Sequence, residues 1–286
     1  MSGRLVVCPT PIGNLEDVTL RVLSALRDAD VVACEDTRRT RVLLDRYGVN
    51  ARLVSYHEHN ERSRAGQLVE RMRGGETVAL VSDAGMPLVS DPGYVLVRAC
   101  VGAGLPVEVL PGPSAAITAL VASGLPADEW RFGGFLPRKK GELRRALSEP
   151  GGTLVAFESP RRVPSTLALL ASLDPSREVA VCRELTKVHE EIVRGTAAEL
   201  AERYAETPPR GEVVLVVGAG VDAGTEAGAA AGPSAAAAGA AASPAAVDAL
   251  RRLVEAGAKP RKAAAIVAEL TGSRANDLYR AVTRDT

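Results

Sequence analysis

The chain has 286 residues, of which 46% are hydrophobic and 24% are charged, and its 35 basic residues balance its 35 acidic ones. This composition is typical of a globular protein, and the zero net charge provides no bulk attraction for a polyanion. No apolar run approaches the ~18 residues of a membrane helix, and the first apolar run is too soon broken for a secretory signal. We therefore expect a cytoplasmic chain with no membrane partner.

Short β-branched runs alternate with helix-period stretches in the first part of the chain. We expect strands at residues 5–7, 31–33, 77–81 and 107–110. Apolar stripes at helical spacing lie between them, and the Asp91-Pro-Gly segment is typical of a helix start. This alternation predicts a mostly parallel sheet covered by helices.

A second set of elements begins near residue 153. Strands are expected at 153–157, 178–182 and 213–217, and helices at 160–171 and 197–204, while residues 112–150 are expected to connect the halves. The fold class is therefore α/β, with a ligand cleft between two domains. The expected domains are residues 1–112 and 113–218.

The remaining residues have a different composition. Residues 219–244 are almost entirely alanine, glycine, serine and proline, which predicts a flexible linker. Three short amphipathic stretches in residues 245–286 predict a small all-α, helix-turn-helix-like module.

Cysteine and histidine usage indicates neither disulfides nor a metal site. The cysteines, Cys8, Cys34, Cys100 and Cys182, have no paired spacing and fall in or beside apolar segments, so we expect buried free thiols. The run from His57 to His59 has no second ligand cluster to complete a metal site, and we expect no metal.

Small, turn-forming residues follow two of the expected strands. The segments are Val81-Ser-Asp-Ala-Gly-Met-Pro-Leu-Val-Ser-Asp-Pro-Gly93 and Pro111-Gly-Pro-Ser-Ala115. Ligands of open α/β sheets bind at loops past the carboxyl ends of the strands, so these segments predict a small-molecule pocket. Gly218-Ala-Gly220 also follows a strand, but no crossover helix follows it, which argues against a nicotinamide or flavin site.

Charged residues follow several other strands. They occur in Cys34-Glu-Asp-Thr-Arg-Arg-Thr-Arg41, Leu136-Pro-Arg-Lys-Lys-Gly-Glu-Leu-Arg-Arg145, Ser159-Pro-Arg-Arg162 and Arg183-Glu-Leu-Thr-Lys-Val-His-Glu-Glu191. Each run alone is explained by a solvated surface. A single cleft with a basic rim, binding an anionic substrate, explains them together.

Seven segments in the same order resemble the tetrapyrrole-methylase superfamily and, within it, the 16S ribosomal RNA cytidine 2′-O-ribose methyltransferases. They are Pro9-Thr-Pro-Ile-Gly-Asn-Leu15, Cys34-Glu-Asp-Thr-Arg-Arg-Thr40, Ser82-Asp-Ala-Gly-Met-Pro87, Ser90-Asp-Pro-Gly93, Pro111-Gly-Pro-Ser-Ala115, Phe157-Glu-Ser-Pro-Arg-Arg162 and Arg183-Glu-Leu-Thr-Lys-Val-His-Glu-Glu191. The resemblance spans residues 5–218 and includes the helical tail. The long Ala/Gly linker departs from the family but touches none of these segments.

The resemblance implies two α/β domains with S-adenosylmethionine in the cleft between them, a homodimer, and 16S rRNA as substrate within the 30S subunit. Carried over position by position, the cofactor loops would be formed by Thr10, Pro11, Ile12, Ser82, Asp83, Ala84, Gly85, Met86, Ser114, Ala115, Phe157 and Leu185.

A ribose hydroxyl is a weak nucleophile, so the reaction calls for a base or a polarising partner. The candidates are Glu35, Asp36, His57, Glu158, Lys187 and His189, and the sequence does not choose among them. Phosphate contacts, which position RNA, are expected from Arg38, Arg39, Lys139, Lys140, Arg144, Arg145, Arg161 and Arg162. The tail is expected to dock onto rRNA; the alternative is a solubilising or dimer-supporting bundle.

Two competing functions stay open. A corrin-type tetrapyrrole substrate would require an apolar, aromatic mouth, and only 3% of this chain is aromatic. A non-catalytic RNA-binding adaptor would have no use for intact segments at 82–85 and 111–115.

Overall fold

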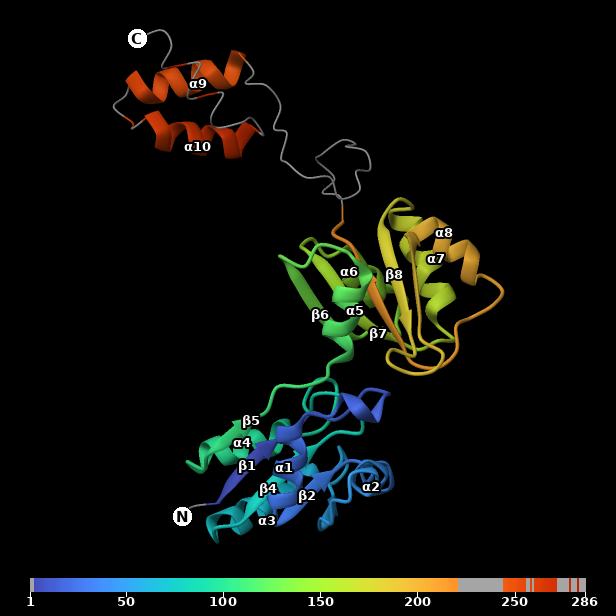
Figure 1. Ribbon diagram of the computed structural model, residues 1–286. Coiled ribbons are helices and arrows are strands. Elements are labelled where there is room, and N and C mark those ends of the chain that lie inside the picture. Colours follow the sequence, from blue (N-terminus) through green and yellow to red (C-terminus); the bar gives the residue numbers. More distant parts are fainter. Residues whose placement is uncertain are drawn as a thin grey trace. The chain divides into compact units, whose positions relative to one another are not determined.

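The computed structural model describes residues 3–220, 244–255, 258, 260–271, 278 and 282 (Figure 1). The chain divides into two compact units, Met1–Thr225 and Glu226–Thr286. The first unit contains two five-stranded sheets. In the described parts of the chain, every helix is too short or too polar to cross a membrane. The domain boundaries within these units stay predictions.

The first sheet is entirely parallel, as expected for the first half of the chain. Its strands run in the order β3-β2-β4-β1-β5. Their bounds are β1 (Arg4–Val7), β2 (Val31–Cys34), β3 (Leu53–Ser55), β4 (Thr77–Val81) and β5 (Val107–Val109). The connecting elements are η1 (Leu15–Asp17), α1 (Leu20–Asp28), α2 (Thr37–Arg46), α3 (Glu61–Arg73) and α4 (Tyr94–Gly102).

Helices cover both faces of this sheet because its strands are apolar on both sides. Along β1, Leu5 and Val7 pack with residues of α3 and α4, whereas Val6 packs with residues of α1 and α2. Successive strand side chains point to opposite faces, so a continuous apolar run needs two covering layers. The carboxyl ends of the strands are left free to carry the site.

The second sheet is mixed, with the order β6-β7-β10-β8-β9. Its strands β6 and β7 are parallel, and the other neighbours are antiparallel. The bounds are β6 (Trp130–Phe135), β7 (Thr153–Glu158), β8 (Glu178–Arg183), β9 (Glu191–Thr196) and β10 (Val213–Val217). One face is covered by α6 (Lys140–Ser148), α7 (Val163–Leu173) and α8 (Ala197–Tyr204), and the other by α5 (Ala115–Ser123).

Residues 112–150, expected to connect the halves and from 113 on to belong to the second domain, contain α5, β6 and α6, which belong to the second sheet and its layers. The strands β3, β6 and β9 were not predicted. Strand β6 contains Gly133 and Gly134, the latter with φ +60°, and its pairing with β7 shifts register between Phe132 and Phe135. Glycine and a register shift break the regular alternation by which a strand is identified.

All four cysteines are buried and free, as expected. Burial, followed by the charge of Glu108, raises the pKa of Cys8 to about 12. Burial also raises the pKa of Cys100 to about 11. These thiols therefore stay protonated at neutral pH and behave as small apolar groups.

The second unit contains α9 (Pro244–Glu255) and α10 (Pro260–Thr271), two of the three helices expected in the tail. They pack through Leu250, Ala264 and Val267, and Leu278 is buried in the same cluster. The remainder of the expected third helix, and residues 221–243 of the expected linker, lie outside the described residues.

Candidate active site

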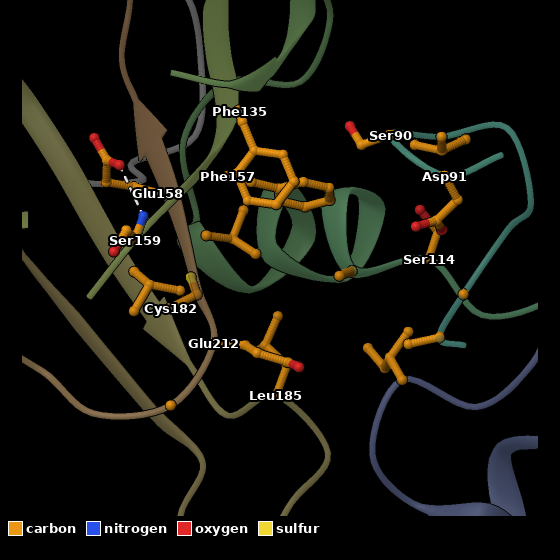
Figure 2. A pocket seen from close by; sticks show the side chains of 18 of the residues that line it. Ser90, Asp91, Ser114, Phe135, Phe157, Glu158, Ser159, Cys182, Leu185 and Glu212 are labelled. Carbon is orange, nitrogen blue, oxygen red and sulfur yellow. Dashed lines mark hydrogen bonds between the residues drawn. The ribbon is translucent and has the colours of Figure 1, made fainter. Parts of the chain in front are cut away.

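A cavity of about 410 Å³ lies where loops from both sheets of the first unit meet (Figure 2). This volume falls in the range of small-molecule sites. The first sheet and its loops contribute Ile12 and the segment after β4. The other wall comes from the N-terminus of α5, the ends of β6, β7 and β8, and the start of β10.

Most of the residues predicted to bind the cofactor line this cavity. They are Ile12, Ala84, Gly85, Met86, Ser114, Ala115, Phe157 and Leu185. The structure thus brings together residues that are up to 173 positions apart (185 minus 12). The other predicted members, Thr10, Pro11, Ser82 and Asp83, are absent from the lining and lie in the same loops.

Thr10 and Ser82 hold two of the lining loops together. The backbone groups of Thr10 and Gly85 exchange two hydrogen bonds of 2.9 Å each. The buried Thr10 hydroxyl donates to the carbonyl of Ser82 at 3.0 Å, and the Ser82 hydroxyl donates to the carbonyl of Gly85 at 3.2 Å. These bonds fix the loop after β1 against the loop after β4.

Asp83 joins the loop after β4 to the start of α2. Its Oδ1 accepts the backbone N–H of Asp36 at 2.9 Å, and its Oδ2 lies 3.6 Å from Nε of Arg39. The carboxylate therefore already has protein partners, and a contact between Asp83 and a cofactor stays a prediction.

Two loops that border the site have strained backbone. In the described residues, the non-glycine positions with positive φ are Leu88 and Ser90 after β4, and Glu184 and Thr186 after β8. Such conformations are rarely adopted by L-residues and cluster at functional sites. Their occurrence on both sides of one cavity indicates that the site dictates the shape of these loops.

The N-terminus of α5 opens onto the cavity. Ser114 is the N-cap residue, yet its side chain makes no capping hydrogen bond, and both Ser114 and Ala115 line the cavity. The first N–H groups of a helix have no partner inside the helix, and they carry partial positive charge. This end of the cavity is therefore suited to a carboxylate or a ring oxygen.

Two of the catalytic candidates are held by strong local ion pairs. Asp36 is the N-cap of α2, and its hydrogen bonds from Arg38 lower the pKa of its carboxyl to about 2. Burial opposes protonation of Lys187, but hydrogen bonds to Glu184 and Glu212, at 2.9 and 3.0 Å, still raise its pKa. Neither group is a good proton acceptor at neutral pH.

Glu158 is buried, and both of its carboxylate oxygens accept hydrogen bonds. Its carboxylate accepts the backbone N–H of Ser159 and the hydroxyl of Thr166, both at 2.7 Å, and lies 3.2 Å from Arg162. Arg162 also donates to the carbonyls of Leu136 and Pro137. The guanidinium of Arg162 is therefore already occupied, although it was expected to contact RNA phosphate.

Among the six catalytic candidates only Glu158 lines the cavity; Asp36, Lys187 and the remaining three lie outside the lining. Glu35 is half-buried after β2, and burial, followed by the charge of Asp83, raises its pKa. His57 is half-buried, and its Nδ1 is a buried atom without a hydrogen-bond partner within the described residues. His189 is exposed on the loop between β8 and β9.

Two acidic residues of the cavity, Asp91 and Glu212, were missed as candidates. Asp91 lines the cavity and follows Ser90 in the strained loop after β4 (Figure 2). Burial, followed by the charge of Glu35, raises the pKa of Asp91 to about 6. The Ser90-Asp-Pro-Gly93 segment is one of the seven segments that resemble the methylase superfamily. The sequence alone, however, gives no sign that the carboxyl of Asp91 faces the pocket.

The remaining basic residues expected to contact RNA are on the surface. The exposed residues are Arg38, Arg39, Lys139, Lys140, Arg144, Arg145 and Arg161. Arg38 is paired with Asp36 and Lys139 with Glu142. Within the described residues, no group of three or more histidine, cysteine or acidic side chains is placed to hold a metal ion.

Comparison with known proteins identifies the family. Residues 4–201 match the model for Tetrapyrrole (Corrin/Porphyrin) Methylases. The protein named ribosomal RNA small subunit methyltransferase I from Mesorhizobium japonicum is 46% identical over 281 residues, which cover 96% of this chain and 90% of that protein.

Solved structures share the fold. Uroporphyrin-III-C-methyltransferase from Thermus thermophilus has a TM-score of 0.57 at 24% identity and covers 76% of this chain and 94% of its own. A structure of the Thermus thermophilus enzyme complexed with S-adenosyl homocysteine has a TM-score of 0.54 at 23% identity, covering 76% and 97%. The family match, the sequence relative and the two-sheet architecture agree: this chain belongs to the tetrapyrrole (corrin/porphyrin) methylase family.

Proposed function

We propose that this protein transfers the methyl group of S-adenosylmethionine to the 2′-hydroxyl of a cytidine ribose in 16S rRNA. The observation that carries the proposal is 46% identity, over 96% of this chain, to a ribosomal RNA small subunit methyltransferase. The seven ordered segments of the sequence resemble enzymes of this specificity, and most of the residues carried over from them line one cavity.

The cavity fits the cofactor in size and chemistry. Its volume of about 410 Å³ suits a nucleoside-sized ligand, and Phe135 and Phe157 pack edge to face at 5.3 Å beside it, offering apolar ring surfaces. The free N–H groups at the N-terminus of α5 can donate hydrogen bonds to the carboxylate of the amino-acid part. A structure of the same fold was solved with S-adenosyl homocysteine.

When bound, S-adenosylmethionine supplies a methyl carbon made electrophilic by its sulfonium. The protein then has to hold the ribose oxygen in line behind that carbon and exclude competing water, and positioning of this kind lowers a barrier strongly. The small residues Ala84, Gly85 and Ala115 leave the cavity open for the donor. Exposed arginines such as Arg39 and Arg161 can bind the phosphates that flank the target ribose.

The proposal is tested by incubating the protein with a methyl-labelled donor and either naked 16S rRNA or assembled 30S subunits. Nucleoside mass spectrometry should find the label in 2′-O-methylcytidine. The two RNA substrates also reveal whether the subunit must be assembled. Label confined to another nucleoside, or to a tetrapyrrole supplied in a parallel reaction, would contradict the proposal.

A non-catalytic RNA-binding adaptor is separated from the enzyme by cofactor affinity alone. Calorimetry with S-adenosylmethionine should show binding in the micromolar range if the cavity is the cofactor site. No heat of binding at high micromolar concentration, with RNA binding intact, would favour the adaptor.

We also propose that the protein is a homodimer in the cytoplasm. Support comes from apolar side chains that the described chain leaves in solvent: Val109 on the edge strand β5 is 58% exposed, and Val121 on α5 is 74% exposed. Apolar side chains of this kind mark a partner contact where they gather into one patch. Light scattering after size exclusion should give twice the chain mass of 29.8 kDa; a monomeric mass at micromolar concentration would contradict it.

A further inference from the structure

Three carboxylates line the cavity, from Asp91, Glu158 and Glu212. Glu158 is paired with Arg162, and Glu212 is paired with Lys187 at 3.0 Å. Within the described residues, Asp91 makes no ion pair. Figure 2 places Asp91 across the cavity from Glu158, beside Ser90 and Ser114. The cavity thus presents one carboxylate that no cation neutralises.

The loop after β4 is built to hold Asp91 in this place. Leu88 and Ser90 have φ of +72° and +68°, and Gly93 has φ of +142°. A Cβ atom at Gly93 would lie 2.7 Å from Cδ1 of Leu88, so Gly93 packs closely against Leu88 within this loop. Strain of this kind persists only where the surrounding structure fixes it. The backbone that carries Asp91 is therefore held in this shape, with the side chain at the cavity.

The surroundings of Asp91 are acidic. Glu35 from the loop after β2 and Asp83 from the end of β4 both oppose its ionisation, and the hydroxyl of Ser82 favours it. Glu158 and Glu212 face the cavity from the second sheet, each held by its own cation. Burial and these charges raise the pKa of Asp91 to about 6. A general base is most effective when its pKa lies close to the working pH.

We propose that the carboxylate of Asp91 accepts the proton of the attacking ribose hydroxyl. This inference deepens the proposed function and rests on it. As the bond between the ribose oxygen and the methyl carbon forms, the bond between that carbon and sulfur breaks, and its electron pair stays on sulfur. The hydroxyl proton passes to Asp91, which releases it to solvent.

The experiment compares the full-length protein with Asp91→Asn, which keeps the size of the side chain and one acceptor oxygen but cannot take up the proton. Binding of S-adenosylhomocysteine by calorimetry should change less than threefold. Single-turnover methylation of 16S rRNA should slow by about 10²-fold or more, the range for loss of a general base. Asp45→Asn, on the exposed surface of α2, is the matched control and should leave both values unchanged.

The pH dependence is the second measurement. The wild-type single-turnover rate should rise with pH and level off above about 6, because ionised Asp91 is the active form. The rate of the Asp91→Asn protein should be low and should not follow that curve. A rate and a profile like those of the wild type would overturn the proposal.

Thermal unfolding is a readout that does not depend on activity. The pKa of Asp91 is raised above the ordinary value of 3.8, so its protonated form stabilises the fold at low pH, and this stabilisation is lost as the pH rises through about 6. Asp91→Asn should therefore melt about 3 °C higher than the wild type at pH 8 and within about 1 °C of it at pH 4. Equal melting temperatures at both pH values would show that Asp91 is not held in this environment.

The outcomes separate this inference from the proposed function. If the wild type methylates no cytidine ribose, the proposed function fails regardless of Asp91. If the wild type is active and Asp91→Asn loses S-adenosylhomocysteine affinity by tenfold or more, Asp91 is a cofactor ligand, and the assignment of the base is overturned.

Discussion

The backbone N–H of Asp36 donates a hydrogen bond of 2.9 Å to the carboxylate of Asp83, which lies 47 residues away in the sequence. The bond ties the start of α2 to the loop that lines the cavity. The carboxylate of Asp83 thereby holds the loop that carries Ala84 and Gly85. A direct contact between Asp83 and the cofactor stays a prediction, but loss of this hydrogen bond should by itself weaken cofactor binding through the loop.

Replacing Asp83 should weaken cofactor binding without unfolding the protein. Asp83→Ala leaves the half-buried N–H of Asp36 without an acceptor, which costs about 1–3 kcal/mol, and lets the loop move. We expect the affinity for S-adenosylmethionine to fall about tenfold, with the far-ultraviolet circular dichroism unchanged. Asp83→Asn keeps an acceptor oxygen, so its affinity for S-adenosylmethionine should lie between those of the wild type and Asp83→Ala. Unchanged affinity in Asp83→Ala would show that this loop does not shape the site.

The cavity itself is tested by filling it. Ala115 lies at the first position of α5 and lines the cavity, so Ala115→Leu adds three carbons where the donor is expected. The dissociation constant for S-adenosylhomocysteine should rise more than tenfold, while the melting temperature falls by no more than about 2 °C. The matched control is Ala198→Leu on the exposed side of α8. Equal affinity in both variants would place the donor elsewhere.

Arg162 should contribute to stability more than to RNA binding. Arg162→Ala leaves the Glu158 carboxylate, whose side chain is 1% exposed, buried without its cation, and breaking such a pair costs about 3–5 kcal/mol. Urea unfolding should show this decrease in stability. Adding Glu158→Gln should recover part of it, because no unpaired charge then remains. The control is the exposed neighbour: Arg161→Ala should change the free energy of unfolding by less than about 0.5 kcal/mol.

Exposed basic residues should act on RNA affinity and its salt dependence. Arg144 and Arg145 lie on the exposed side of α6, and within the described residues neither makes an ion pair. Arg144→Ala combined with Arg145→Ala should raise the KM for RNA and reduce the slope of log affinity against log salt by about 0.7–0.9 for each phosphate that an arginine no longer neutralises. Affinity for the donor should not change. Arg27→Ala with Arg98→Ala is the control; if it has the same effect, RNA binding by α6 is not specific.

The helical tail should serve the large substrate rather than the donor. Removal of residues 245–286 takes away eight basic and five acidic residues. We expect slower methylation of 30S subunits, by about tenfold, with donor affinity unchanged within about twofold. Equal methylation rates with and without the tail would refute a docking role and favour its alternative role as a solubilising or dimer-supporting bundle.

The sequence by itself determined four of the five parallel strands of the first sheet, all but the edge strand β3, and the location of the ligand loops. Apolar runs such as Thr77–Val81, followed directly by glycine, proline and serine, show both the strand and its functional end, because burial and turn formation are local properties of the chain. The burial of the four cysteines follows from the same local patterns. Strand β6 was not predicted because its glycines interrupt that pattern.

Only the tertiary structure decided which charges are free to act. In the sequence, Glu158, Arg162 and Asp91 have the same description: each is a charged residue that follows an expected strand. In the fold, the first two neutralise each other at 3.2 Å, whereas Asp91 faces the cavity with Glu35 and Asp83 nearby. The reactivity of a carboxyl depends on its neighbours and on its exclusion from water. Asp91 acquires Glu35 from the loop after a different strand, and no local pattern in the chain encodes that neighbour.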